Sequence, residues 1–245
     1  MTRAGRTHSP ERMAIVQWTA RLGAVTAEAL ALRESSSVAS ARSRLLAAER
    51  GGLLSRRQPL AGQPALYSVT AAGLRVSGVR GLEPCRISPA NAAHAIACAG
   101  VAAVLERRYT DHHLLGEREL RRDERECGAQ LASAYLGLGP DDAPLLHRPD
   151  LVLWPQRPGG GLPVAVEVEL TVKAPQRLFA ICLAWARCRC VAGVLYLAAR
   201  EVERALERAI AKAQAAERIV VVPIDALAGV EQAVTPSAST VPGAA

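Results

Sequence analysis

The stretch from His147 to Lys173 gathers the side chains best suited to chemistry. It reads H-R-P-D-L-V-L-W, then a turn rich in Pro and Gly, then P-V-A-V-E-V-E-L-T-V-K. Both apolar runs have the composition of strands. Side chains alternate between the two faces of a strand. The second run therefore places its valines and Leu170 on one face, and on the other face it places Ala165, Glu167, Glu169, Thr171 and Lys173.

These acidic residues raise a physical question, because the apolar segment 176–187 that follows is predicted to be a buried helix covering the sheet. An uncompensated charge in a covered strand costs several kcal/mol. The acidic face is therefore either solvated or engaged in binding. Asp150 begins the neighbouring strand, and together with Glu167 and Glu169 it would form an oxygen-rich pocket. Mg²⁺ and Mn²⁺ prefer such ligands, so the sequence suggests one of these ions.

The same residues resemble the PD-(D/E)xK signature of restriction-endonuclease-like proteins. Pro149-Asp150 matches its first half, and Glu167-Val168-Glu169 matches the second half except at the last position, where active members carry a lysine. Lys173 lies four residues further on, and some members move the lysine to such a place. The resemblance therefore implies the catalytic candidates Asp150, Glu167, Glu169 and Lys173.

A charge-dense run, Gly116–Arg122, precedes this motif. Such a run most simply forms the solvated face of a helix. The resemblance also implies that an upstream glutamate can complete the metal site, and Glu117 is the candidate ahead of Glu119. The predicted metal ligands are thus Asp150, Glu167 and Glu117.

Composition limits the class of protein. The chain has 245 residues, a net charge of +7 and a pI near 9.5, which suits a polyanionic partner such as double-stranded DNA. No apolar run is long enough to span a bilayer and no signal peptide is evident, so we expect a cytoplasmic protein without membrane contact. The six cysteines show no paired framework and are interpreted as reduced core residues. Cys188-x-Cys190 could be half a metal site, but it lacks a partner pair.

Residues 9–78 are predicted to form a winged helix-turn-helix. Helices are expected from Pro10 to Leu22, from Thr26 to about Arg33 and from Val38 to about Arg50, with Ser9, Thr26 and Ser37 as N-caps. A β-hairpin follows, and then a short capped turn beginning at Thr70. The inward face of the third helix is predicted to be Val38, Ala41, Leu45 and Ala48.

In this arrangement the third helix would enter the major groove of DNA and the arginines of the hairpin would contact phosphates. Arg44 is the predicted base reader, and a protein-interaction role remains the alternative for this domain. The predicted DNA-binding residues are Ser37, Ser40, Arg42, Ser43, Arg44, Arg56 and Arg57.

The remaining chain is predicted to be α/β. Residues 79–108 form a connector and a linking helix in which His94 is expected to be a packed core residue. Residues 109–228 should form a restriction-endonuclease-like mixed sheet covered by helices, with further strands near 191–197 and 218–223 and a helix near 201–216. Residues 229–245 are predicted to be a disordered tail.

As a whole, the chain resembles the replication-relaxation family of plasmids and other mobile elements. The resemblance rests on G-L-L-S-R-R, Y-S-V-T-A-A-G-L, A-A-H-A, E-R-E-L-R, R-P-D-L and V-E-V-E-L-T-V-K. It implies a DNA-binding protein for plasmid replication, mobilisation or transcriptional control, with a nuclease-like C-terminal domain kept for DNA contact or homodimer formation. The alternative is a Mg²⁺-dependent DNA endonuclease using Asp150, Glu167 and Lys173, and a third interpretation is a protein-interaction adaptor.

Overall fold

The structure is a computed structural model that describes residues 9–157 and 159–227. The prediction made for the tail 229–245 lies outside this part of the chain. The N-terminal part contains four helices and three strands. Their bounds are α1 (Pro10–Leu22), β1 (Ala24–Val25), α2 (Ala27–Arg33), α3 (Val38–Arg50), β2 (Leu54–Arg57), β3 (Leu66–Val69) and α4 (Ala71–Ser77).

Helix starts in this part follow the predicted capping residues. The Ser9 hydroxyl accepts a hydrogen bond from the Arg12 backbone N–H at 3.3 Å, which satisfies a donor that the first turn would leave unpaired. Thr26 caps α2 and Ser37 caps α3 in the same way, at 3.0 and 3.2 Å. The predicted bounds of α1, α2 and α3 are confirmed.

The three strands form an antiparallel sheet in the order β1-β3-β2. The hairpin β2–β3 was predicted, whereas β1 has only two residues and no recognisable pattern. The inward face of α3 consists of Ala41, Leu45 and Ala48, which are buried. Val38 was predicted to belong to this face, but its exposed fraction is 38% because it lies in the first turn, beyond the edge of the core.

The C-terminal part is built on a five-stranded mixed sheet in the order β10-β9-β8-β7-β4. Strands β8, β9 and β10 are parallel, and β7 is antiparallel to both of its neighbours. The prediction of a mixed sheet covered by helices is confirmed. Its elements are α5 (Pro89–Arg108), β4 (His112–Gly116), α6 (Glu117–Cys127), β7 (Leu151–Pro155), β8 (Val164–Glu169), α7 (Pro175–Arg187), β9 (Gly193–Ala198), α8 (Arg200–Lys212) and β10 (Ile219–Pro223).

A separate two-stranded sheet, β5 (Ala134–Leu138) and β6 (Pro144–His147), lies beside α7 and was not predicted. It leads directly into the motif, since β6 ends at His147 and Asp150 follows three residues later. This short sheet therefore fixes where the chain enters β7.

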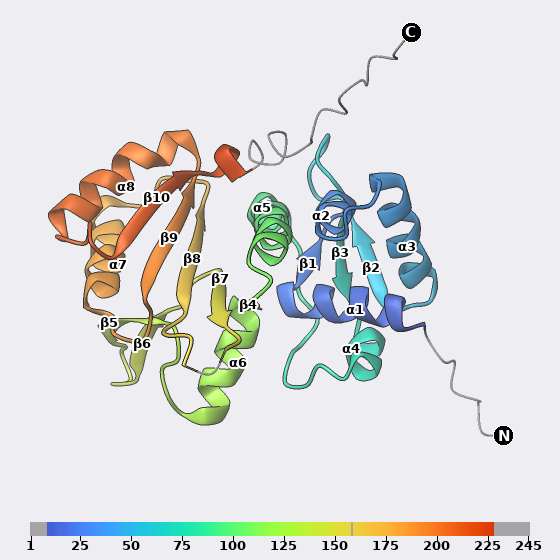
Figure 1. Cartoon of the computed structure of the whole chain (residues 1–245), viewed down its shortest axis with the longest axis horizontal. Coiled ribbons are helices and arrows are strands. Elements are labelled where there is room, and N and C mark those ends of the chain that lie inside the picture. Colours follow the sequence, from blue (N-terminus) through green and yellow to red (C-terminus); the bar gives the residue numbers. More distant parts are fainter. Residues whose placement is uncertain (1–8, 158, 228–245) are drawn as a thin grey trace, which may run out of the picture.

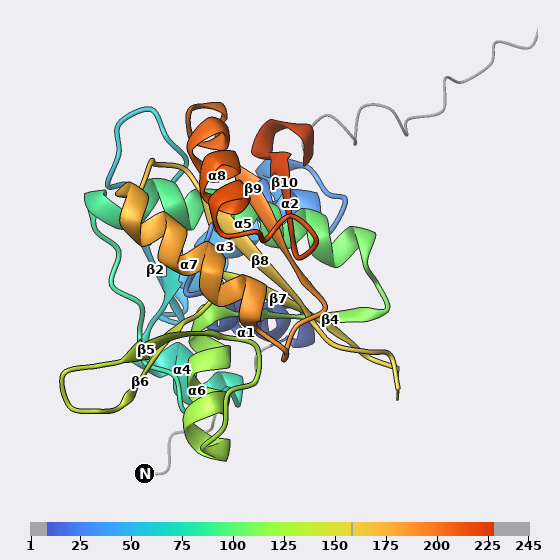
Figure 2. The same ribbon diagram turned by 90° about the vertical axis from the view of Figure 1, so that its left-hand side faces the viewer.

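Helices cover both faces of the large sheet, with α7 and α8 on one face and α5 on the other (Figures 1 and 2). Strand β8 has the predicted alternation. Val164, Val166 and Val168 pack toward α5, and Ala165 packs toward α7 and α8. Glu167 and Glu169 lie in alternation with Ala165, and both are buried. Because both glutamates are buried, solvent cannot compensate their charges, and partners within the fold or a ligand must do so.

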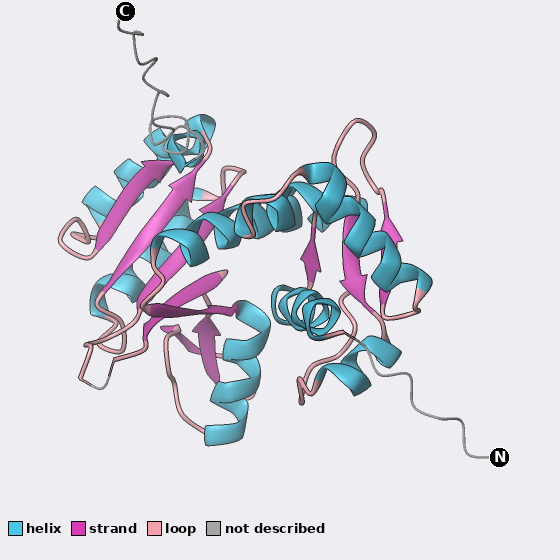
Figure 3. Cartoon of the chain, turned by 45° about the vertical axis from the view of Figure 1, so that its right-hand side comes forward, coloured by secondary structure: helices cyan, strands magenta, loops and turns pink. Residues whose placement is uncertain are grey.

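Helix α5 belongs to two cores at once. Ala99 and Ala103 pack with the N-terminal helices, while Val101, Ala102 and Leu105 pack against the large sheet. The helix consequently lies between the two parts of the molecule (Figures 1 and 3). It was predicted to link the parts, and the structure shows that it also fixes them side by side. Within residues 9–157 and 159–227, no helix combines the length and apolar character that a membrane crossing requires.

Candidate functional site

Asp150 lies at the point where β7 begins, beside the end of β8. Antiparallel pairing sets Leu151 opposite Val166, so the residue before Leu151 faces the carboxyl-terminal half of β8. The Asp150 Oδ2 atom accepts a hydrogen bond from the Val168 backbone N–H at 2.8 Å. This contact holds the carboxylate in one orientation and directs Oδ1 toward α5.

His94 on α5 meets that second oxygen, with its Nε2 atom 2.8 Å from Asp150 Oδ1. The prediction that His94 is a packed core residue is wrong, because its side chain is 44% exposed and bonded to a carboxylate. The hydrogen bond to Asp150 raises the pKa of His94, since the carboxylate favours the charged imidazole.

Cys98 follows one helical turn after His94, and its Sγ atom lies 3.3 Å from the same Nε2 atom. Burial raises the pKa of the Cys98 thiol well above its usual range, and the negative charge of Asp150 acts in the same direction. The thiol was assigned to the core from sequence and does pack against the core between α5 and the large sheet, but it also lines a cavity next to Asp150.

Glu167 lies on the opposite side of the sheet, under α7. Its Oε1 atom is 2.7 Å from His147 Nε2 and accepts a hydrogen bond from Trp185 Nε1 at 3.1 Å. Burial raises the pKa of Glu167, although His147 opposes the shift. Side chains of the protein therefore compensate the charge of Glu167, and its Oε1 atom already has two hydrogen-bond partners.

Glu169 and Lys173 compensate each other. Their side chains form an ion pair, and Glu169 is buried while Lys173 is partly covered. Burial lowers the pKa of Lys173, whereas nearby Glu167 and Asp150 counteract that shift. Lys173 therefore lies in the electrostatic field of the predicted catalytic carboxylates, but the direct partner of its ammonium group is Glu169.

Glu117 begins α6, and its backbone N–H donates to the Asp150 carbonyl at 2.9 Å. Its carboxylate pairs with Arg121, and both residues line the same cavity as Asp150. Glu119 instead is buried, with Arg21 3.5 Å away. The two glutamates that the sequence left in competition therefore have different surroundings, and only Glu117 lies next to Asp150.

The carboxylates of the predicted magnesium ligands, Asp150, Glu167 and Glu117, do not lie around one point. Among the residues that the structure describes, one group of three His, Cys, Asp or Glu residues has all its donor atoms within 4.8 Å of one another, and it consists of His94, Cys98 and Asp150. Glu167 faces α7 and is engaged with His147 and Trp185. Mg²⁺ and Mn²⁺ require several oxygen ligands around one point, so Asp150, Glu167 and Glu117 do not fit either ion in this arrangement.

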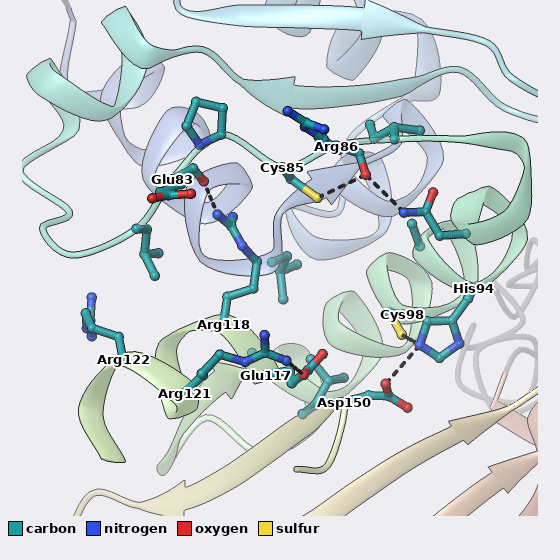
Figure 4. A pocket seen from close by; sticks show the side chains of 18 of the residues that line it. Glu83, Cys85, Arg86, His94, Cys98, Glu117, Arg118, Arg121, Arg122 and Asp150 are labelled. Atoms are coloured by element: carbon teal, nitrogen blue, oxygen red, sulfur yellow. Dashed lines mark hydrogen bonds and ion pairs between the residues drawn. The ribbon is translucent and has the colours of Figure 1, made fainter. Parts of the chain in front are cut away.

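A cavity of about 620 Å³ opens beside the His94–Cys98–Asp150 group (Figure 4). It lies between α5, α6 and the connector 81–87, and its wall is rich in arginine: Arg86, Arg118, Arg121, Arg122 and Arg125. Arg118 is anchored, since its Nη1 donates to the Ala20 carbonyl at 2.9 Å. These five arginines outnumber the three acidic residues of the lining, Glu83, Glu117 and Asp150, and this balance favours an anion.

The predicted DNA-binding residues lie together on α3 and the β2–β3 hairpin, but they differ in availability. Arg44 pairs with Glu34 and donates to Ser36 Oγ at 3.0 Å, so it is held against the turn between α2 and α3 rather than presented outward. The side chains exposed to solvent are Ser37, Ser40, Arg42, Ser43, Arg56 and Arg57.

Sequence reasoning gave no role in this site to four residues that shape it: His94, Cys98, His147 and Trp185. His147 could have been noticed because it lies three residues before Asp150. His94 and Cys98 have the i, i+4 spacing of a helical ligand pair, which also occurs by chance in any helix. Comparisons of the chain with models of protein families, with curated protein sequences and with solved structures found no match.

Proposed function

We propose that this protein binds double-stranded DNA through α3 and the β2–β3 hairpin, in the manner of a winged helix. The single observation that carries the proposal is the order of the elements together with their exposed side chains. Three helices are followed by a hairpin, and the solvent-facing side of α3 and the hairpin carry hydroxyl and guanidinium groups. These are the groups that contact phosphates and base edges.

Charge supports the same proposal. Arg56 and Arg57 are exposed on β2, and they form no ion pair with any residue in the described part of the chain. Arg42 lies on the exposed side of α3, and its ion pair with Glu28, at 3.6 Å, is exposed to solvent. Three arginines are thus available for phosphates, and the net charge of +7 favours association with a polyanion. The resemblance to the replication-relaxation family implies the same partner.

The C-terminal domain is proposed to support binding without cleaving DNA. Cleavage by Asp150, Glu167 and Lys173 would need open carboxylate oxygens and a lysine directed at the reacting water. Here Glu167 Oε1 is bonded to His147 and Trp185, both oxygens of Asp150 are bonded, to His94 and to Val168, and Lys173 pairs with Glu169. Glu169 also occupies the position where the resemblance requires lysine. This arrangement favours a nuclease-like domain retained for contact over a magnesium-dependent endonuclease.

Fluorescence anisotropy with the full chain and a labelled duplex tests the binding proposal. The variant Arg42→Ala/Arg56→Ala/Arg57→Ala should bind at least tenfold more weakly, a loss of about 1.4 kcal/mol or more. Its affinity should also depend less steeply on salt, because fewer counterions are released. The matched control is Arg200→Ala/Arg204→Ala/Arg208→Ala on α8, which removes the same number of exposed positive charges. Equal effects of the two triple substitutions would show that only net charge matters, and the assigned surface would be wrong.

Incubation of supercoiled plasmid with Mg²⁺ or Mn²⁺ tests the proposed lack of cleavage. We expect the plasmid to remain intact. Nicking that disappears in both Asp150→Asn and Lys173→Ala would establish the endonuclease instead and would overturn this part of the proposal.

A further inference from the structure

His94, Cys98 and Asp150 form a compact set of three different donor atoms. His94 and Cys98 project from one side of α5 because they are one turn apart, and Asp150 reaches them from the start of β7 (Figure 4). The chain thus joins two elements that are distant in sequence at one point. An imidazole nitrogen, a thiol sulfur and a carboxylate oxygen all lie within 4.8 Å of one another.

The chemistry of this set selects a class of metal. Magnesium and calcium take oxygen ligands, whereas a thiolate and an imidazole suit zinc and related transition ions. Usual zinc–ligand bond lengths imply separations of about 3.3–3.6 Å between ligand atoms in a tetrahedral site. The Nε2–Sγ separation is 3.3 Å and the Nε2–Oδ1 separation is 2.8 Å. The Nε2–Sγ separation is already within this range. The Nε2–Oδ1 separation must widen by about half an ångström as the ion replaces the proton between His94 and Asp150.

The surrounding contacts support the ligands as a second shell. The Val168 backbone N–H fixes Asp150 Oδ2, which leaves Oδ1 to the ion. The Asp150 carbonyl accepts from the Glu117 backbone N–H, so the start of α6 holds the same residue from the other side. Two rigid elements therefore position the carboxylate before any ion binds.

The fourth coordination position would face the cavity, because all three donors line it. Three protein ligands with one open position are typical of zinc sites that bind water or a substrate, while closed structural sites have four. Arg118, Arg121 and Arg122 line the same cavity and add positive charge to the space that this position would face. An anionic oxygen ligand such as phosphate would be attracted by both the ion and the arginines.

We propose that His94 Nε2, Cys98 Sγ and Asp150 Oδ1 bind one divalent zinc-type ion, whose fourth position faces the arginine-lined cavity. This site shares Asp150 with the magnesium set suggested by the sequence, but it uses His94 and Cys98 of α5 in place of Glu167 and Glu117. It does not depend on DNA binding by α3, so each proposal can fail alone.

Cobalt titration of the full chain, first stripped with a chelator, tests the site. Co²⁺ bound by a thiolate gives a charge-transfer absorption band, and we expect this band to saturate at one ion per chain and to disappear when Zn²⁺ is added. Cys98→Ser should abolish the band. His94→Gln and Asp150→Asn should each weaken binding at least tenfold, and Cys127→Ser, at an exposed thiol outside the site, should change nothing.

A second pair of thiols requires its own control. Cys188 and Cys190 have their sulfur atoms 3.1 Å apart and could bind cobalt themselves. In Cys188→Ser/Cys190→Ser the band should persist. Three results would overturn the proposal. They are loss of the cobalt band in Cys188→Ser/Cys190→Ser, survival of the band in Cys98→Ser, and a wild-type chain that shows no saturable cobalt binding.

Melting curves separate lost binding from lost folding. Without metal, Cys98→Ser should melt cooperatively near the wild-type temperature, because serine is nearly the same size as cysteine. Zn²⁺ should then raise the Tm of the wild type and leave that of Cys98→Ser unchanged, since an ion bound only by the folded state stabilises it. An equal increase in both proteins would place the ion elsewhere.

Discussion

His147 and Glu167 lie beneath α7, and the His147 Nε2 atom is 2.7 Å from Glu167 Oε1. Trp185 donates to the same oxygen and packs edge-on against the His147 ring, with ring centroids 5.8 Å apart. The three side chains come from the chain before β7, from β8 and from α7. They explain how a buried carboxylate is accommodated inside an apolar layer.

The first prediction concerns the charge of Glu167. Burial raises its pKa in the folded protein, so the folded state holds the proton more tightly than the unfolded chain does. The resulting stability is fully present below the unfolded pKa and is lost as the pH rises through the raised value. Each unit of upward shift corresponds to about 1.4 kcal/mol.

Glu167→Gln removes that charge and keeps an oxygen for Trp185 and His147. We expect its free energy of unfolding to exceed that of the wild type above the raised pKa and to vary less with pH. Urea unfolding of chelator-treated protein at a series of pH values measures both. A variant that is less stable than the wild type at neutral pH would show that the carboxylate is needed in its charged form.

The second prediction concerns two glycines in helices. A Cβ atom on Gly73 of α4 would overlap the Leu53 carbonyl and lie 2.8 Å from Val69 Cγ2, whereas Gly100 of α5 has nothing within 4 Å. Gly73→Ala should therefore cost about 1–3 kcal/mol through overpacking. Gly100→Ala should stabilise the protein by about 0.5–1 kcal/mol, because alanine loses less backbone entropy in a helix. Thermal unfolding of both variants checks the opposite signs.

The sequence predicted most helices and strands because their local signals agree with the fold. Ser9, Thr26 and Ser37 cap their helices, and the alternation in β8 persists in the structure. Strand β1 could not be predicted, because two residues carry no periodicity and the strand exists through its pairing with β3. The β5–β6 sheet was missed for a similar reason, since its register shifts between Tyr135 and Gly137 and interrupts the alternation.

The candidate site was only partly predictable. Asp150 and the glutamates of β8 were recognised from their order in the chain, but the partners that determine their roles come from distant elements. His94 approaches Asp150 across the fold, and Trp185 reaches Glu167 from α7. Such contacts depend on how α5 and α7 pack on the sheet, which short sequence patterns do not encode.

The third prediction separates two arginines on α3. Arg44 connects to Glu34 and Ser36, so Arg44→Ala should lower the free energy of unfolding by about 0.5–1 kcal/mol. Arg42 is exposed, so Arg42→Ala should leave stability unchanged and weaken DNA binding. Urea unfolding and fluorescence anisotropy on the same two variants measure the split. If Arg44→Ala weakened binding with no loss of stability, Arg44 would be a base reader after all.

The last prediction concerns the contact between α5 and the N-terminal helices. Glu106 on α5 accepts a hydrogen bond from Trp18 Nε1 at 3.1 Å and pairs with Arg33, whose guanidinium lies 5.0 Å from the centre of the Trp18 ring. Glu106→Ala removes the acceptor and leaves a partly buried indole N–H and a partly buried guanidinium without this partner. We expect a loss of about 1–3 kcal/mol.

Glu106→Gln is the matched variant, because its side-chain oxygen can still accept from Trp18 while the ion pair with Arg33 is lost. Its free energy of unfolding should lie between those of the wild type and Glu106→Ala, and adding salt should narrow the gap to the wild type, since salt screens the ion pair. Urea unfolding at low and high salt measures all three proteins. If Glu106→Ala unfolded at the wild-type urea concentration with an unchanged slope, this cluster would not hold α5 to the N-terminal helices, and the apolar contacts of Ala99 and Ala103 would do so alone.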